Sequence, residues 1–443
     1  MRLFSTADSA LWRLALPMIF SNITVPLLGL VDTAVIGHLD SPVYLGGVAI
    51  GATATSFLFM LLLFLRMSTT GLTAQAFGAN NPSALARALV QPLLLALGAG
   101  AVIVLLRAPL IALALHIVGG HQDLLIQAQR FLEIRWLSAP ASLANLVLLG
   151  WLLGVQYARA PVILLVVGNV LNIVLDVWLV MGLQMNVQGA ALATVTAEYA
   201  TFILGLLMVK KAMGLRGISY TMLKQAWRGN VRRLLALNRD IMLRSLLLQL
   251  CFASVTIVGA RLGSEIVAVN AVLMTLLTFT AYALDGFAYA VEAHSGQAYG
   301  AKNRGQLLEV WGAACRQAGL VALLFAGVYA LSGEQIVALL TSIPELQKQA
   351  DSYLHWQIIL PVVGVWCYLL DGMFIGATRG TEMRNSMAVA ALGFGLSMFS
   401  VPYLGNHGLW LSLAVFLALR GLSLGWIWRR HWKEKTWFNN VQA

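Results

Sequence analysis

Long apolar stretches follow one another along this chain and are separated by short polar loops. A helix that crosses a bilayer needs roughly 20 predominantly apolar residues. Twelve stretches reach that length, and we predict helices at about 12–37, 44–66, 88–110, 127–150, 161–182, 188–209, 238–260, 266–290, 310–331, 352–376, 385–404 and 408–428. The pattern therefore predicts an all-α membrane protein with twelve transmembrane helices.

A motif with polar edges occurs twice, at a spacing of 222 residues. Residues 71–81 read GLTAQAFGANN and residues 293–303 read AHSGQAYGAKN, and five of the eleven positions are identical. Its Gly and Asn residues are typical of a helix C-terminus and a turn, so we interpret the motif as structural. Other residues repeat at nearly the same spacing: Gly37 with Gly259, Pro140 with Pro361, Gly150 with Gly372 and Gly154 with Gly376.

Each half of the chain contains six predicted helices. An even number of crossings gives both halves the same orientation, so the internal repeat is parallel, an arrangement found in secondary transporters. We therefore predict an N-terminal lobe at residues 1–222 and a C-terminal lobe at residues 223–443, with a linker at about 210–236.

Composition and charge agree with a membrane location. Hydrophobic residues make up 59% of the chain and charged residues 11%, against roughly a quarter charged in a soluble domain. The net charge is +11, and the segment 210–233 carries seven basic residues and no acid: Lys210, Lys211, Arg216, Lys224, Arg228, Arg232 and Arg233. We expect a bacterial inner membrane, and the positive-inside rule places the linker and both termini on its cytoplasmic side. Because topology accounts for the charge, we do not expect nucleic-acid binding.

Catalytic and metal-binding patterns do not stand out in the sequence. Cys251, Cys315 and Cys367 lie inside apolar stretches without metal-ligand spacing. The chain contains no HExxH motif. We therefore expect no enzyme activity, no bound cofactor and no metal site apart from the sodium alternative described below.

Two of the acidic residues inside predicted helices of the N-terminal half, Asp32 and Asp176, stand out. Such residues are costly in a bilayer and mark pathways for ions or substrates. Asp32 lies in the outer part of the first helix, and Asn169, Asn172 and Asp176 share one face of the fifth. Neither helix carries Lys or Arg at comparable depth. We therefore favour a functional role over a structural ion pair for Asp32 and Asp176.

The sixth predicted helix begins with small residues, which allow close packing against a neighbour. This packing would bring Thr194 to the depth of Asp176; the alternative is a hydroxyl that bonds only to its own helix. An apolar surround favours the neutral form of a carboxyl group, so we expect Asp32 and Asp176 to exchange protons. Pro26, six residues before Asp32, removes a backbone hydrogen bond and is a candidate hinge.

The C-terminal half offers a candidate second site at Asp371, Asp285 and Glu292. Structural pairing with basic residues such as Arg66 and Arg244 is an equally open interpretation of these acids.

The halves are chemically unequal. The positions that match Asp32 and Asp176 at the repeat spacing are Ser254 and Met398. The predicted acidic site therefore belongs to the N-terminal half.

The whole chain resembles the multidrug and toxic compound extrusion (MATE) family and, within it, the DinF-like branch. The resemblance rests on PLLGLVDTAVIGHL in the first helix, the paired AQAFGAN and GQAYGAK turns, the NxxxD of Asn172 and Asp176, the GAALAT run to Thr194, and the ATRG segment at 377–380. It implies two six-helix lobes arranged as a V. It also implies outward export of drug-like or toxic molecules in exchange for protons or sodium.

The resemblance implies residue roles as well. A proton, or alternatively sodium, would bind at Asp32, Asn172, Asp176 and Thr194. Asp371 matches an acid that serves cation coupling in the sister NorM-like branch. The seventh helix lacks the glutamate of that branch, which weakens the sodium alternative.

We therefore expect a monomeric, proton-coupled exporter of amphipathic or cationic compounds that works by alternating access in the lipid bilayer. One alternative is a sodium-coupled drug exporter, and the other is a lipid or lipid-linked saccharide flippase of the same superfamily. A flippase usually needs basic cavity residues to hold a pyrophosphate, whereas the mid-membrane residues singled out here are acidic.

Overall fold

The computed structural model of the chain describes residues 6–37, 42–229 and 231–439, with the backbone alone for 24–34, 37 and 42. These residues form helices joined by short turns, and no strand occurs among them. Eleven helical segments of the described chain are long and apolar enough to cross a membrane. A further 32-residue helix, α1 (Thr6–Gly37), precedes them. The predicted all-α membrane fold is confirmed.

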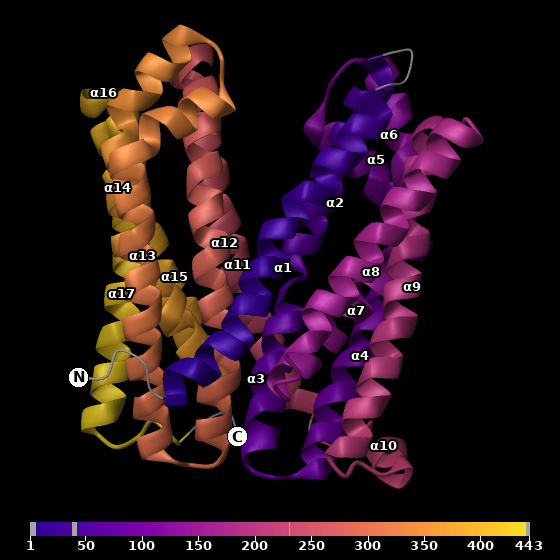
Figure 1. Cartoon of the computed structure of the whole chain (residues 1–443), viewed down its shortest axis with the longest axis vertical. Coiled ribbons are helices and arrows are strands. Elements are labelled where there is room, and N and C mark those ends of the chain that lie inside the picture. The colour runs from indigo at the N-terminus through magenta and orange to yellow at the C-terminus, as the bar shows by residue number, and fades with distance from the viewer. Residues whose placement is uncertain (1–5, 38–41, 230, 440–443) are drawn as a thin grey trace. The chain divides into compact units, whose positions relative to one another are not determined.

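Residues 23–234 pack as one compact unit, called unit 2 here. After the second part of α1 it contains α2 (Pro42–Leu61), α3 (Phe64–Gly78), α4 (Pro82–Leu105), α5 (Arg107–Val118), α6 (Gln122–Arg135), α7 (Ala139–Gly154), α8 (Arg159–Asp176), α9 (Asn186–Leu215) and α10 (Tyr220–Gln225). A 3-10 turn, η1 (Trp136–Ser138), joins α6 to α7, and a π-helical turn, η2 (Val177–Gly182), follows α8. Helix α7 packs against α3 and α4, and α8 lies beside α9 (Figure 1).

Residues 1–22 and 235–443 pack as a second compact unit, unit 1. Its helices are α11 (Val231–Leu262), α12 (Ser264–Gly300), α13 (Arg304–Leu340), α14 (Pro344–Gly376), α15 (Gly380–Ser397), the 3-10 turn η3 (Met398–Ser400), α16 (Val401–Leu404) and α17 (Asn406–Lys433). Helix α14 is the centre of this unit and packs against α12, α13 and α17.

The first part of α1 belongs to unit 1 because its polar side chains bind there. Asp8 forms an ion pair with Arg316 of α13 at 3.2 Å. Trp12 Nε1 donates to Gln317 Oε1 at 3.0 Å, and Asn22 Nδ2 donates to a backbone oxygen of α12 at 3.1 Å. The two units therefore differ from the predicted lobes at the start of the chain and in the linker, where unit 2 extends to residue 234.

The repeated motif forms the same turn in each unit. Asn80 and Lys302 adopt positive φ angles of 51° and 52° directly after α3 and α12. Asn81 and Asn303 then cap α4 and α13, accepting hydrogen bonds from backbone N–H groups at 3.2 and 3.1 Å. Side-chain caps of this kind satisfy backbone donors at the start of a helix. The geometry agrees with the structural interpretation of the motif.

A second repeated feature is a close helix contact at a glycine. A Cβ atom at Gly150 of α7 would lie 2.7 Å from the backbone oxygen of Arg66 in α3. A Cβ atom at Gly372 of α14 would lie 2.7 Å from the backbone oxygen of Ala288 in α12. Arg66 and Ala288 are also 222 residues apart. The same interhelical contact is thus built once in each unit.

Several helices depart from the hydrophobic pattern. Helix α9 continues to Leu215 and α11 begins at Val231, so the interruption between them is shorter than the predicted linker and contains α10. Lys and Arg favour helix and can extend one beyond the apolar span. The predicted helix at 44–66 is instead divided into α2 and α3, and the predicted helix at 385–404 is divided by η3. Hydrophobicity alone does not mark such breaks.

Candidate functional site

Helix α8 places its polar residues toward the interior of unit 2. Asn172 and Asp176 are each 1% exposed, whereas Val166, Val170 and Val174 on the opposite face are exposed. Residues four apart share a helix face, so the two polar side chains lie on one buried stripe. Asn169, the third member of the predicted stripe, is only half-buried.

Thr194 of α9 lies against this stripe. Its Oγ1 lies 3.4 Å from Asn172 Oδ1 and 3.2 Å from the carbonyl oxygen of Ala190. A hydroxyl group has a single proton, so it can donate fully to only one of these two acceptors at a time. The Thr194 hydroxyl is therefore placed both to contact the neighbouring helix and to bond to its own helix, the two alternatives that the sequence left open.

Close packing of α9 on the turn after α8 makes this contact feasible. A Cβ atom at Gly189 would lie 3.0 Å from the carbonyl oxygen of Leu179 in η2. Ala190 and Ala191 are buried beside it. The small residues at the start of α9 thus have the packing role that the sequence predicts.

The backbone is irregular where the stripe ends. The π-helical turn η2 begins directly after Asp176, and the N–H of Leu183 donates to the carbonyl oxygen of Trp178, five residues earlier, at 2.9 Å. Single π-helical turns occur frequently at functional sites. No feature of the hydrophobic pattern predicts this turn.

Asn172 has an unsatisfied donor. Its Nδ2 atom is buried and has no hydrogen-bond partner among the described residues. A buried donor without a partner costs about 1–3 kcal/mol. The site is therefore suited to a further acceptor oxygen, from water or from a carboxyl group.

Asp32 and Pro26 lie within the helical backbone of α1. Their side chains lie outside the described residues, so the predicted meeting of Asp32 with Asn172, Asp176 and Thr194 is neither supported nor opposed by a contact.

The candidate second site in unit 1 has a different character. Asp371 Oδ2 lies 2.6 Å from Arg244 Nη2 and 2.5 Å from Arg420 Nη2, and all three side chains are buried. The triad joins α14, α11 and α17, and we interpret it as a strut between these helices. Asp285 and Glu292 both lie on α12, the former half-buried and the latter 2% exposed.

Arg420 was not singled out from the sequence. The signal was available, because Arg420 is a lone charge deep in a predicted helix.

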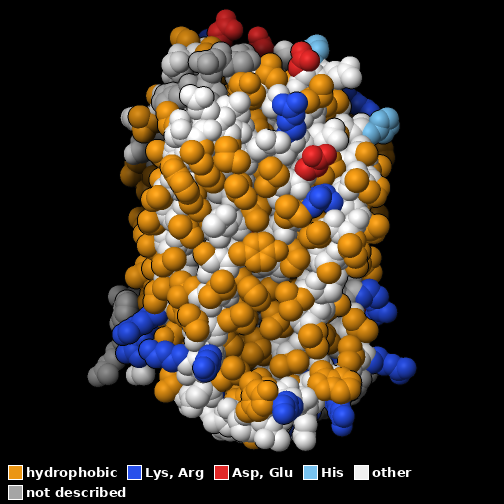
Figure 2. Space-filling model, turned by 90° about the vertical axis from the view of Figure 1, so that its right-hand side faces the viewer, with side chains coloured by type: hydrophobic (Ala, Val, Ile, Leu, Met, Phe, Trp, Pro, Cys, Tyr) orange, Lys and Arg blue, Asp and Glu red, His pale blue; other side chains and the backbone are white. Residues whose placement is uncertain are grey.

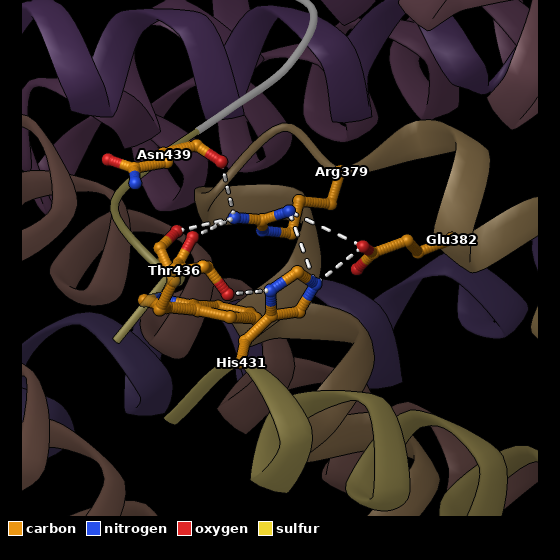
Figure 3. Close-up of polar contacts among 6 residues, drawn as sticks. Arg379, Glu382, His431, Thr436 and Asn439 are labelled. Carbon is orange, nitrogen blue, oxygen red and sulfur yellow. Dashed lines mark hydrogen bonds and ion pairs between the residues drawn. The ribbon is translucent and has the colours of Figure 1, made fainter. Parts of the chain in front are cut away.

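The ATRG segment has a role that its sequence did not indicate. Arg379, in the turn between α14 and α15, donates through Nη2 to the backbone carbonyl oxygens of Thr436, Trp437 and Asn439 at 3.0, 2.6 and 3.0 Å. Trp437 is only 1% exposed. The segment after α17 is thus folded back onto unit 1 and held by one arginine (Figure 3).

Hydrogen bonds of His431 belong to the same group of contacts. His431 Nε2 lies 2.6 Å from Glu382 Oε1, and His431 Nδ1 lies 2.7 Å from Thr436 Oγ1 (Figure 3). The cluster orders the C-terminal segment, and none of its residues belongs to the predicted coupling site.

Comparison with known proteins gives two matches of this chain to one family. The MatE family model matches residues 17–178 and, separately, residues 241–404. The two matches fall in the two halves of the chain, as a duplication requires.

Named relatives cover almost the whole chain. DNA damage-inducible protein F of Escherichia coli (strain K12) is 81% identical over 438 residues, which are 99% of this chain and 95% of that protein. The probable multidrug resistance protein NorM of Bradyrhizobium diazoefficiens is 28% identical over 91% of this chain and 89% of its own length. The crystal structure of MATE in the bent conformation has a TM-score of 0.86 at 23% identity, over 99% of this chain and 98% of that chain, and shows the same fold.

Proposed function

The chain belongs to the MatE family of multidrug efflux transporters, and on this premise we propose that it exports amphipathic or cationic toxic compounds in exchange for protons. The observation that carries the proposal is the pair of buried polar residues Asn172 and Asp176, with the half-buried Thr194 against Asn172, in an apolar, membrane-spanning unit. A polar group inside a membrane persists mainly where it serves an ion or substrate pathway. Asp32 is proposed as the second carboxylate of this cluster.

The cluster has the groups that a proton-coupled switch needs. A carboxyl group accepts a proton, and the amide and hydroxyl beside it can each donate or accept. The Thr194 hydroxyl has two acceptors, Asn172 Oδ1 and Ala190 O, on two different helices. We propose that protonation changes which acceptor it uses and so alters the packing of α8 on α9. Pro26 is proposed as the place where α1 bends in the same step.

The proposed topology follows from the charge distribution. Most Lys and Arg side chains on the face shown in Figure 2 lie toward its lower end, below a broad hydrophobic band. Basic loops remain on the cytoplasmic side of bacterial inner membranes. We place both termini and the α9–α11 connection there, and alternating access then carries substrate outward as protons move inward.

The proton gradient is large enough for this work. One proton that moves inward across 100 mV supplies roughly 2.3 kcal/mol, and each unit of pH difference adds about 1.4 kcal/mol. One-for-one exchange can therefore hold roughly a 500-fold gradient of a neutral substrate. Exchange of a monovalent cation for a proton moves no net charge, so each unit of pH difference holds about a tenfold gradient of a cation.

The test uses purified protein in liposomes that contain a pH-sensitive dye. A pH gradient is imposed and a fluorescent lipophilic cation is added, with and without sodium. We expect substrate-triggered proton flux that needs no sodium and that is lost in Asp32→Asn and Asp176→Asn. The matched control is Glu133→Gln, because Glu133 is an exposed acid of the same unit.

Other outcomes separate the alternatives. Flux that requires sodium supports the sodium-coupled exporter, in which the same oxygens would hold the ion. Undiminished flux in both Asp variants would sink the proposed site. The lipid flippase is less favoured, because the buried Arg244 and Arg420 already bind Asp371 and are not available to a pyrophosphate.

A further inference from the structure

Glu198 is an acidic residue in the middle of α9. The helix runs from Asn186 to Leu215, and at 1.5 Å per residue Glu198 lies about 18 Å from its start and about 26 Å from its end. The carboxyl group is therefore deep in the bilayer. Ionisable residues at such depth are candidates for a functional role.

The side chain lies on the inward face of α9. Thr196, Tyr199 and Ile203 are exposed and mark the outer face. Thr194 and Glu198 are four residues apart and lie on the opposite face, which packs against α7 and α8. Glu198 is half-buried there.

An amide is the partner of this carboxyl group. Asn145 Nδ2 of α7 donates to Glu198 Oε2 at 3.1 Å and to the carbonyl oxygen of Glu198 at 3.2 Å. No Lys or Arg of the described chain lies within ion-pair distance of Glu198. A charge at the centre of a bilayer without an opposite charge is costly, whereas a protonated carboxyl group is served well by a neutral amide.

In the part of the chain that the structure describes, no charged residue of the helices packed against α9 forms an ion pair with Glu198. Helices α2 and α7 and the turns η1 and η2 carry no charged residue, and the charged residues of α6 and α8 are Asp123, Arg130, Glu133, Arg135, Arg159 and Asp176. Arg135 donates to the hydroxyl of Ser138 and lies 5.3 Å from the ring centre of Phe59. Glu133 accepts from Gln129 at 3.2 Å. Neutrality at Glu198 therefore requires a mobile cation, of which the proton is the smallest.

We propose that Glu198 is a further proton-binding carboxylate of unit 2, through which protons pass from the Asn172–Asp176–Thr194 cluster toward the end of α9 that carries Lys210 and Lys211. The inference rests on the proposed function. Thr194 and Glu198 lie one helical turn apart on one face of α9, but their side chains bond to other groups and not to each other, so water would connect them. A proton leaves a carboxyl group of the cluster, binds the Glu198 carboxylate and is then released to water.

Asn145 is a positioning residue in this scheme. Its Nδ2 donates to a carboxyl oxygen that accepts whether or not the group carries a proton. The bond therefore keeps the carboxyl group in place through both halves of the cycle.

The experiment compares Glu198→Gln and Glu198→Asp with the wild-type protein in the proteoliposomes described above. Glutamine keeps an acceptor for Asn145 but does not carry a proton. We expect substrate-driven proton flux to fall roughly 100-fold in Glu198→Gln, the usual loss for a missing proton-transfer group, with a fall of less than about two-fold in exchange of labelled for unlabelled cation. Exchange needs no net proton release. Glu198→Asp should keep part of the flux and shift its pH profile, and Glu133→Gln should match the wild type.

Each other outcome is decisive. Proton flux within two-fold of wild type in Glu198→Gln, with wild-type coupling intact, overturns this inference and leaves the proposed function standing. Loss of both flux and exchange in protein that elutes and unfolds like the wild type assigns Glu198 to substrate binding or structure instead. Absence of proton flux in the wild-type protein overturns the proposed function together with the inference.

Discussion

Units 1 and 2 share a backbone plan but surround buried carboxyl groups with different partners. In unit 1, Asp371 lies between the guanidinium groups of Arg244 and Arg420. In unit 2, Glu198 meets the amide of Asn145, and Asn172, on the same helix face as Asp176, meets the hydroxyl of Thr194. A guanidinium group only donates and holds a carboxylate in one geometry. Amides and hydroxyls donate or accept, so they serve a carboxyl group with or without its proton.

The difference teaches how a duplicated fold can divide its work. The turns after α3 and α12 and the glycine contacts of α7 and α14 are the same in both units. Backbone packing was therefore retained while buried side chains diverged. We infer that the arginines of unit 1 stabilise a fixed helix arrangement, whereas the amide beside Glu198 in unit 2 serves that carboxyl group with or without its proton.

The largest effect is expected at the ion triad. Asp371→Asn leaves two buried guanidinium groups without their anion, and loss of one partner of a buried ion pair costs about 3–5 kcal/mol. The matched change in unit 2, Glu198→Gln, keeps the hydrogen bond from Asn145 and should cost less than about 1 kcal/mol. The free energy of unfolding in mixed micelles, followed by near-ultraviolet circular dichroism, measures both. Equal losses for the two variants would remove the distinction between strut and proton site.

Much of this architecture could be predicted from the sequence, because bilayer helices are specified by continuous hydrophobicity and the repeat by a visible motif. The juxtaposition of Asn172 and Thr194 was also predictable, since helical spacing and small residues at the start of α9 fix which faces meet. Glu198 was missed, although it is a lone acid in a predicted helix, the same signal that singled out Asp32 and Asp176.

Other features follow from contacts that a single sequence does not display. The π-helical turn after Asp176 is a shift in backbone hydrogen bonding without a residue signature. The pairing of Asp371 with Arg244 joins residues 127 positions apart. Packing of the first turns of α1 in unit 1 depends on partners such as Arg316, 308 positions from Asp8. Helical periodicity carries no information about which distant helix supplies a partner.

A smaller effect is expected at the repeated glycine contact. Gly150→Ala and Gly372→Ala each place a Cβ atom 2.7 Å from a backbone oxygen, and overpacking of this kind costs about 1–3 kcal/mol. Because the contact is the same in both units, the two losses should agree within about 0.5 kcal/mol. Gly98→Ala is the control, since a Cβ atom there meets nothing within 4 Å, and it should not destabilise. If only one of the two variants loses stability, the backbone of the other unit can move to accept the added Cβ atom, and the contact is not equally tight in both units.

The smallest effect is expected at the hydroxyl between α8 and α9. Thr194→Ala removes the donor to Asn172 Oδ1 at 3.4 Å, a long bond worth about 1 kcal/mol, so substrate-driven proton flux should fall about five-fold. Thr194→Ser keeps the hydroxyl and should stay near wild type. Thr196→Ala is the matched control, because the Thr196 hydroxyl bonds only to its own helix, at Leu192 O, and lies on the exposed face. If Thr196→Ala and Thr194→Ala slow transport equally, the hydroxyl acts through helix stability alone, and the contrast between the units rests on their carboxyl groups.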